Sequence, residues 1–202
     1  MMLSNSLFSG NVSNRMLAQQ LKRGEQIIKS GKATTRYTPR SPFPMEFWLK
    51  RTRTTDPAAR KQWTEEATVQ KALWDQEAKS RGANMGDMGD ALALSFVMAW
   101  EAQTAGEKAT SAQFKGTAGG FRKMLLGNAY YQSMSHAEKQ TYIEGQLLNA
   151  SDAVRLLREA KQAGDTATLQ KARADGKKAT DTWLQKGQTH FVPNPSGFTG
   201  TK

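Results

Sequence analysis

Apolar residues recur at three- and four-residue steps through most of the chain, the spacing of one face of an α-helix. The clearest run starts at Ser135 and Glu138, which form a capping box, and ends at Gly164. Its apolar positions are Ile143, Leu147, Ala150, Val154 and Leu157. A second run ends at Gly187 and uses Leu169, Ala172, Gly176, Ala179 and Trp183. Because the turn at Gly164 and Asp165 is short, the pattern predicts two antiparallel neighbouring helices.

Three further helices are predicted before this pair. One begins at Asp56, whose carboxylate precedes a proline at the first helical position, and ends near Gly82. The next, ALALSFVMAWEAQ, is capped by Asp87 or Asp90 and is apolar nearly all round, which is typical of the central helix of a bundle. A third opens at Ser111 and has three interior glycines. Because each glycine weakens the helix, their presence indicates that they allow close helix packing. They are Gly116, Gly119 and Gly120.

The N-terminal region divides at its prolines. Residues 14–31 are predicted to form a helix that presents Leu17, Leu21 and Ile28, whereas residues 32–44 include three prolines and are predicted to be an extended linker. Residues 1–13 and 188–202 are expected to be a non-helical arm and tail, with part of the tail docked on the bundle. The predicted fold is therefore all-α: an irregular bundle of six to seven helices, with its main domain over residues 45–187.

Composition removes several classes of chemistry. The 202 residues include no cysteine, which excludes disulfides, thiolate nucleophiles and zinc ribbons, and leaves the redox compartment open. The longest apolar stretch, residues 91–100, is about half the length that a membrane-spanning helix needs. The N-terminal sequence as given shows no export signal, because Ser and Asn interrupt its apolar residues.

Positive charge is concentrated near the N-terminus. The formal net charge is +11, and residues 1–61 hold twelve Lys and Arg against Glu25, Glu46 and Asp56, a net of +9. Such asymmetry favours an anionic partner, although a solubilising surface would show the same count. The candidate contacts are Arg36, Arg40, Lys50, Arg51, Arg53, Arg60 and Lys61.

Aromatic residues lie among these cations. Tyr37, Phe43, Phe47 and Trp48 suit either base stacking in a single-strand nucleic-acid binder or packing along the bundle. No RRM, KH or zinc-finger pattern accompanies them. Nucleic-acid binding through residues 36–61 is therefore the alternative hypothesis.

No catalytic, cofactor or metal site is predicted. The two histidines, His136 and His190, have no catalytic pattern around them, and Asp87 and Asp90 already have a role as helix caps. The leading hypothesis is a non-enzymatic interaction or structural protein that binds a protein partner or its own copies. An enzyme would need groups that meet only in three dimensions: Asp87, Asp90, Glu101, Tyr130, Tyr131 and His136.

Five segments of the chain carry a resemblance to a known family. They are the linker SGKATTRYTP, the helix end SFVMAWEAQTAG, the helix start MSHAEKQTYIEGQLLNA, the helix pair that closes through AGDTATLQKARADGKKA, and the Gly-Phe tail. Over residues 25–198 the chain resembles a bacterial domain-of-unknown-function family of small helical proteins that are often made with an export signal. The resemblance implies a helical domain in the cell envelope or outside the cell. It implies no activity, cofactor or catalytic residue.

Overall fold

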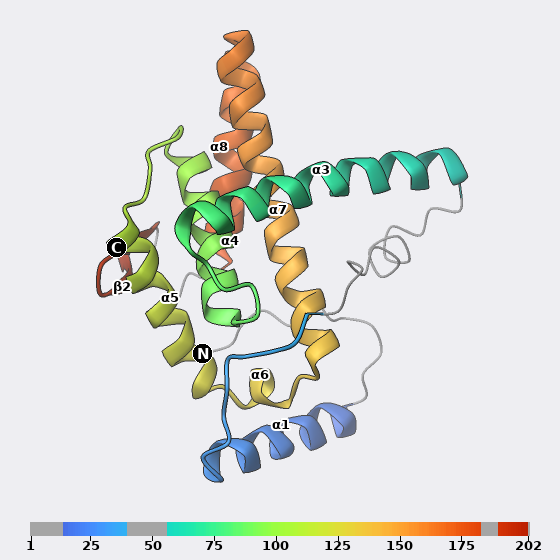
Figure 1. Ribbon diagram of the computed structural model, residues 1–202, viewed down its shortest axis with the longest axis vertical. Helices are drawn as coiled ribbons and strands as arrows, with labels where there is room; N and C mark the ends of the chain where they lie inside the picture. The colour runs from blue at the N-terminus through green and yellow to red at the C-terminus, as the bar shows by residue number, and fades with distance from the viewer. Residues whose placement is uncertain (1–13, 40–55, 183–189, 202) are drawn as a thin grey trace.

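A computed structural model describes residues 14–39, 56–182 and 190–201. It contains seven helices and one two-stranded hairpin in these ranges, which confirms the predicted all-α bundle with non-helical ends (Figure 1). The helices are α1 (Asn14–Lys29), α3 (Pro57–Arg81), α4 (Met88–Gln103), α5 (Ser111–Leu126), α6 (Ala129–Ser133), α7 (His136–Ala163) and α8 (Thr166–Asp181). The strands are β1 (His190–Asn194) and β2 (Gly197–Thr201).

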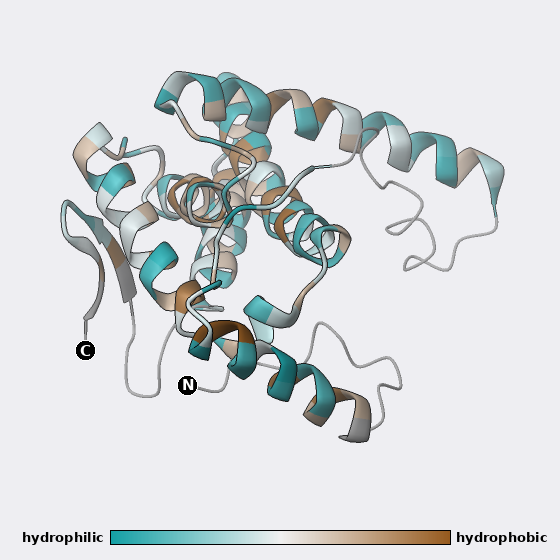
Figure 2. Ribbon diagram, turned by 60° about the horizontal axis from the view of Figure 1, so that its bottom comes forward, coloured by the Kyte–Doolittle hydropathy of each residue, from teal (hydrophilic) through white to brown (hydrophobic). Residues whose placement is uncertain are grey.

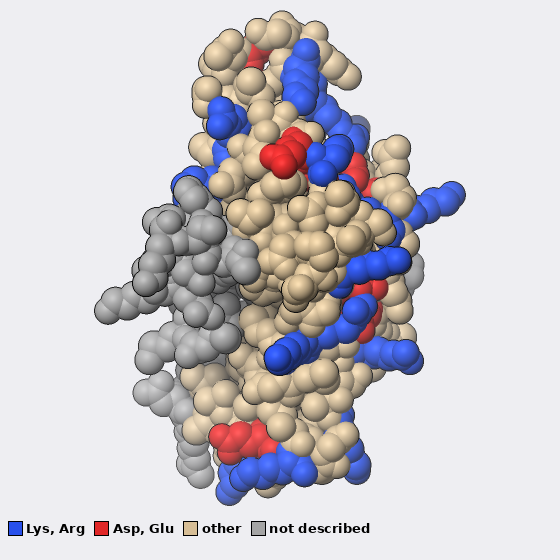
Figure 3. Space-filling view, turned by 90° about the vertical axis from the view of Figure 1, so that its left-hand side faces the viewer, with Lys and Arg blue, Asp and Glu red and all other residues tan. Residues whose placement is uncertain are grey.

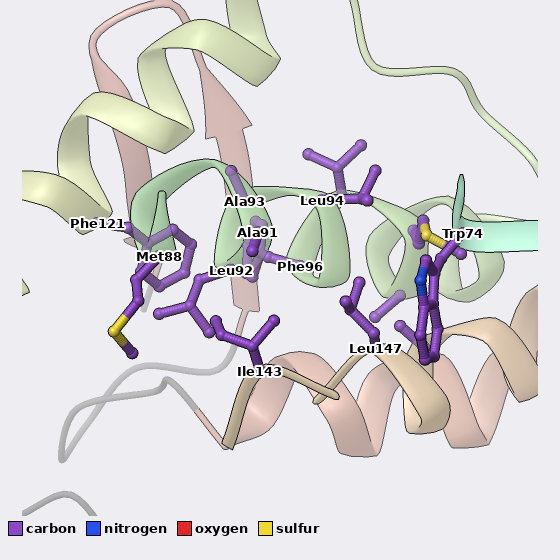
Figure 4. Close-up of a cluster of buried hydrophobic side chains, with 14 of the residues drawn as sticks. Trp74, Met88, Ala91, Leu92, Ala93, Leu94, Phe96, Phe121, Ile143 and Leu147 are labelled. Carbon is purple, nitrogen blue, oxygen red and sulfur yellow. The ribbon is translucent and has the colours of Figure 1, made fainter. Parts of the chain in front are cut away.

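Helix α4 is the centre of the core, as its all-round apolar pattern predicts. Every residue from Met88 to Ala102 is buried, and α3, α5, α7 and α8 surround it. Figure 4 shows Phe121 of α5 at one end of the cluster and Trp74 of α3 at the other, with Leu147 of α7 alongside α4. Burial of these large side chains supplies the main stabilisation of the fold.

The predicted helix ends are largely confirmed by their caps. Asp56 accepts hydrogen bonds from two backbone N–H groups of α3, and the Ser135 and Glu138 capping box starts α7. Gly164 ends α7 with a φ of 65°, so the chain turns directly into α8. Helix α5 begins at Ser111, as predicted, and Thr110 is its N-cap and forms a capping box with Gln113. Asp87, rather than Asp90, caps α4.

The tail forms a hairpin on α5, a structure that the helical pattern did not predict. Strand β1 pairs antiparallel with β2, and Phe198 of β2 lies against Phe96 and Phe121, with ring centroids 5.7 and 4.8 Å apart. The hydroxyl of Thr117 donates to the Gly197 carbonyl at 3.1 Å. The hairpin therefore covers one side of the core with a tail side chain, consistent with the expected docking.

The glycines of α5 explain how the hairpin reaches the helix. A Cβ at Gly116 would lie 2.4 Å from the carbonyl oxygen of Asn194, and one at Gly120 would lie 3.2 Å from the Phe198 ring. The close packing that the sequence indicated is thus packing against a hairpin rather than another helix. Gly176 does allow a helix crossing, because a Cβ there would lie 2.5 Å from the Ala99 carbonyl oxygen of α4.

The N-terminal segment runs from α1 into the body of the protein. Residues 32–39 are non-helical, as expected for the described part of the linker, and Tyr37 and Met88 donate backbone hydrogen bonds to Gly86 and Thr35 respectively. Helix α1 lies at the base of the bundle next to α6 (Figure 1). The rest of the predicted linker, residues 40–44, lies outside the described residues.

Candidate functional site

The start of α4 joins three parts of the chain through two aspartates. Asp87 accepts from the Thr35 hydroxyl at 2.6 Å and from Arg122 Nε of α5 at 3.1 Å, and Arg122 Nη2 bridges to Asp90. Asp90 also accepts from the Asn84 backbone N–H at 2.9 Å. Burial alone would raise the pKa of Asp87, but the Thr35 hydroxyl, backbone N–H and Arg122 guanidinium together hold it below its usual value. This cluster fixes the linker to α4 and α5.

A second buried network links α3, α4 and α7. Glu101 accepts from Arg81 and Lys108, each at 2.7 Å, and its carboxylate is almost fully buried. Arg81 also bonds Glu77 at 3.2 Å, and Glu77 accepts from Arg158 at 2.9 Å. Because every acid here has a cationic partner, the network is best explained as an internal clamp between helices.

A third group surrounds the first half of α7. Glu144 is 7% exposed and accepts from Gln140 at 2.8 Å through Oε1, while its Oε2 has no hydrogen-bond partner among the residues that the structure describes. Burial raises its pKa to about 7. Tyr37 lies close enough for the Glu144 charge to raise the tyrosine's pKa further, beyond the effect of burial. Nearby, the hydroxyls of Tyr131 and Tyr142 are 3.0 Å apart, and burial raises the pKa of Tyr131 to about 12.

The residues considered for a carboxylate-based enzyme fall into different groups. Asp87 and Asp90 pair with Arg122, whereas Glu101 lies in the clamp with Arg81. His136 is exposed at the start of α7 and its Nδ1 accepts from the Thr38 backbone N–H at 3.0 Å. Among the described residues, no three His, Cys, Asp or Glu side chains are placed to hold a metal ion.

The N-terminal cations form an uncompensated basic region. We use this name for five exposed side chains: Lys22, Arg23, Lys29, Lys32 and Arg36. In the part of the chain that the structure describes, none of them forms an ion pair, although Arg23 donates to the Ser133 carbonyl at 2.9 Å. By contrast, α3, α7 and α8 carry ion pairs at i,i+4 spacing, such as Lys61 with Glu65.

Basic side chains also spread over the face that includes α5. Figure 3 shows Lys and Arg on this face at more places than Asp and Glu. Helix α5 contributes Lys115, Arg122 and Lys123 and contains no acidic residue. Of these three, Arg122 is already paired with two aspartates.

The predicted contact residues are separated by the fold. Arg36 is exposed in the linker, while Arg60 and Lys61 are exposed on the first turns of α3, which lie apart from the linker in Figures 1 and 2. Tyr37 is buried in the core and therefore packs rather than stacks on a ligand. The remaining candidates lie outside the described residues: Arg40, Phe43, Phe47, Trp48, Lys50, Arg51 and Arg53.

Four members of the basic region were not singled out from the sequence. Lys22, Arg23, Lys29 and Lys32 were included in the charge count, but their exposure and their lack of acidic partners within the described ranges are properties of the fold. The helical spacing of α1 was a usable signal, because it turns its charged residues away from Leu17 and Ile28.

The fold is that of a helical protein built around one buried helix, α4. The buried carboxylates in these clusters mainly join its helices and linker to one another. The chain belongs to the family of unknown function DUF6683, which matches residues 2–185. The C-terminal hairpin lies beyond the matched range. Comparisons with curated proteins and with solved structures find no match. No described helix is long and apolar enough to cross a membrane.

Proposed function

We propose that this protein is a non-enzymatic interaction protein that binds an anionic partner through the basic region. The observation that supports this is the contrast in charge pairing. Five exposed cations of residues 22–36 have no ion-pair partner among the described residues, whereas α3, α7 and α8 each pair some of their cations with a carboxylate of the same helix, such as Lys71, Arg155 and Lys171. Unpaired cations keep their long-range attraction for an anionic surface, whereas a neighbouring carboxylate cancels much of it.

The test compares two variants that lose the same formal charge. The first replaces four cations of the basic region: Lys22→Gln, Lys29→Gln, Lys32→Gln and Arg36→Gln. The control replaces four cations that are paired within helices: Lys71→Gln, Arg155→Gln, Lys171→Gln and Lys177→Gln. We expect the first variant to elute from immobilised heparin at clearly lower salt than the parent, and the control to shift much less.

Circular dichroism should show the same helix content in both variants, since all eight positions are on or near the surface. Equal shifts for the two variants would mean that net charge alone controls binding, and the basic region would then lose its assigned role.

A further inference from the structure

Helix α1 separates apolar from charged residues around its axis. At 100° per residue, its apolar positions fall on one arc centred on Gly24, and its cations fall on the rest of the circumference. The apolar arc consists of Met16, Leu17, Leu21, Ile27 and Ile28. Figure 2 shows hydrophobic and hydrophilic positions alternating along this helix at the edge of the molecule.

The body of the protein covers this arc incompletely. Among residues 16–29 of α1, only Gly24 is buried. A Cβ at this position would lie 1.8 Å from the Ala129 carbonyl oxygen of α6. On either side of this approach, Leu17, Ile27 and Ile28 are half-buried, and Leu21 is 36% exposed. The main packing partner of the 16-residue α1 among the described elements is the five-residue α6.

Apart from the packing of α1 on α6 and the Arg23 hydrogen bond to Ser133, the chain is attached to the body by residues that follow α1. Thr34 donates its backbone N–H to Gln132 at 2.9 Å, and Tyr37 donates to Gly86 at 2.9 Å. Gly31 has a φ of 69°, a conformation that glycine adopts readily, and it separates α1 from these anchors. Helix α1 could therefore leave α6 while residues 34–37 stay in place.

We propose that α1 is an interfacial helix that leaves α6 and lies on an anionic phospholipid surface. This inference rests on the proposed function and names its partner. The apolar arc enters the boundary of the acyl chains, and Lys22, Lys29 and Lys32 contact the anionic headgroups. A helix with a strong apolar face, a basic polar face and low average hydropathy has the composition of helices that bind membranes in this way.

A nucleic acid explains less of this surface. Phosphates would engage the cations of the basic region, but they offer nothing to the half-covered apolar arc beside them. A lipid surface binds both arcs of the same helix. The two partners therefore differ in their dependence on Leu21, which contributes apolar area and no charge.

The first experiment measures binding of the full chain to vesicles by flotation. We expect binding to vesicles of mixed phosphatidylglycerol and phosphatidylcholine, and little binding to phosphatidylcholine alone. Leu21→Gln should weaken binding to the mixed vesicles roughly five-fold and leave elution from heparin unchanged. Leu126→Gln is the matched control, because Leu126 is similarly exposed, at 40%, on α5.

The second experiment tests whether α1 must leave α6. Gly24→Ala puts a methyl group against the Ala129 carbonyl and weakens the docked state, so we expect it to bind the mixed vesicles several-fold more tightly. Gly119→Ala adds the same methyl group to another helix at a point where no described neighbour lies within 4 Å, and it should leave vesicle binding unchanged. Unchanged or weaker binding by Gly24→Ala would overturn the release of α1.

The third experiment locates the inserted helix. Since the chain has no cysteine, Leu21→Cys and Leu126→Cys each give one attachment point for an environment-sensitive dye. We expect mixed vesicles to shift the emission of the dye at position 21 to the blue and to leave position 126 unchanged. Binding to heparin without vesicle binding would reject the lipid surface but keep the proposed function, while failure to bind either would reject both.

Discussion

Glu144 is an ionisable side chain in a buried environment. It lies on a helix that the sequence predicts, and it accepts a hydrogen bond from Gln140 of the same helix. Its burial and its proximity to Tyr37 of the linker, however, are set by tertiary packing. Helical spacing identifies neither Tyr37 as a core residue nor Glu144 as a buried acid. Both depend on which face of α7 the linker crosses.

The raised pKa of Glu144 predicts a loss of stability as pH increases. In the folded protein the pKa of Glu144 is about 7, above its usual value of 4.5, so the unfolded chain releases this proton at lower pH. Stability is therefore highest below pH 4.5 with respect to this group and falls as pH rises towards 7. We expect a loss of about 1–2 kcal/mol, allowing for solvent screening, in urea unfolding between pH 5 and pH 8.

Glu144→Gln keeps an acceptor for Gln140 and removes the titration, so its unfolding free energy should change less over the same pH range. A pH slope identical to that of the parent would show that Glu144 ionises normally in the folded protein. The comparison uses the slopes, because the substitution also changes the hydrogen bonding of the buried Oε2 position.

At the scale of elements, α5 and the C-terminal hairpin show where the helical pattern is incomplete. The sequence indicated close packing at the α5 glycines and partial docking of the tail. The tail docks, and Gly116 and Gly120 are closely packed, but no described atom lies within 4 Å of a Cβ placed at Gly119. It did not identify the partner of the glycines, because the five-residue strands β1 and β2 have little pattern of their own and are held by α5. The short helix α6 was missed for the same reason, since five residues carry no helical period.

Two glycines of α5 should respond oppositely to alanine. Gly116→Ala places a Cβ 2.4 Å from the backbone of Asn194, so we expect it to displace the hairpin and lower the unfolding free energy. At Gly119 no atom of the described residues lies within 4 Å of an added Cβ, and alanine should stabilise the helix by about 0.5–1 kcal/mol. Urea unfolding measures both effects, and limited proteolysis of the tail reports displacement of the hairpin.

Faster proteolysis of the tail is expected for Gly116→Ala and not for Gly119→Ala. If both variants gained stability equally, the close approach of the hairpin to α5 would be wrong.

The whole molecule is held together by polar clamps in addition to its apolar core. The apolar pattern around Glu101 predicts that it lies in the central helix. Its cationic partners, Arg81 of α3 and Lys108 of the loop before α5, are 20 and 7 residues away in the sequence. Through Arg81 and Glu77 the same network reaches Arg158 of α7. It therefore couples three helices that meet only in the folded chain.

We expect Glu101→Gln to lower the unfolding free energy by about 2–4 kcal/mol, because it leaves the partly buried Arg81 and the adjacent Lys108 without this carboxylate. Glu65→Gln is the matched control, since it removes an exposed ion pair with Lys61 and should cost less than about 1 kcal/mol. Urea unfolding at neutral pH gives both values, and similar small losses would show that the network contributes little net stability.

The sequence by itself determined the helical class, the central position of α4 and most helix ends. These features follow from local spacing and from caps such as Asp56 and Ser135, whose partners lie within three residues. Tertiary structure decided which side chains are buried together, where the hairpin docks, and which cations remain without acidic partners. Such features depend on contacts between distant segments, and no local period encodes which face of one element meets another.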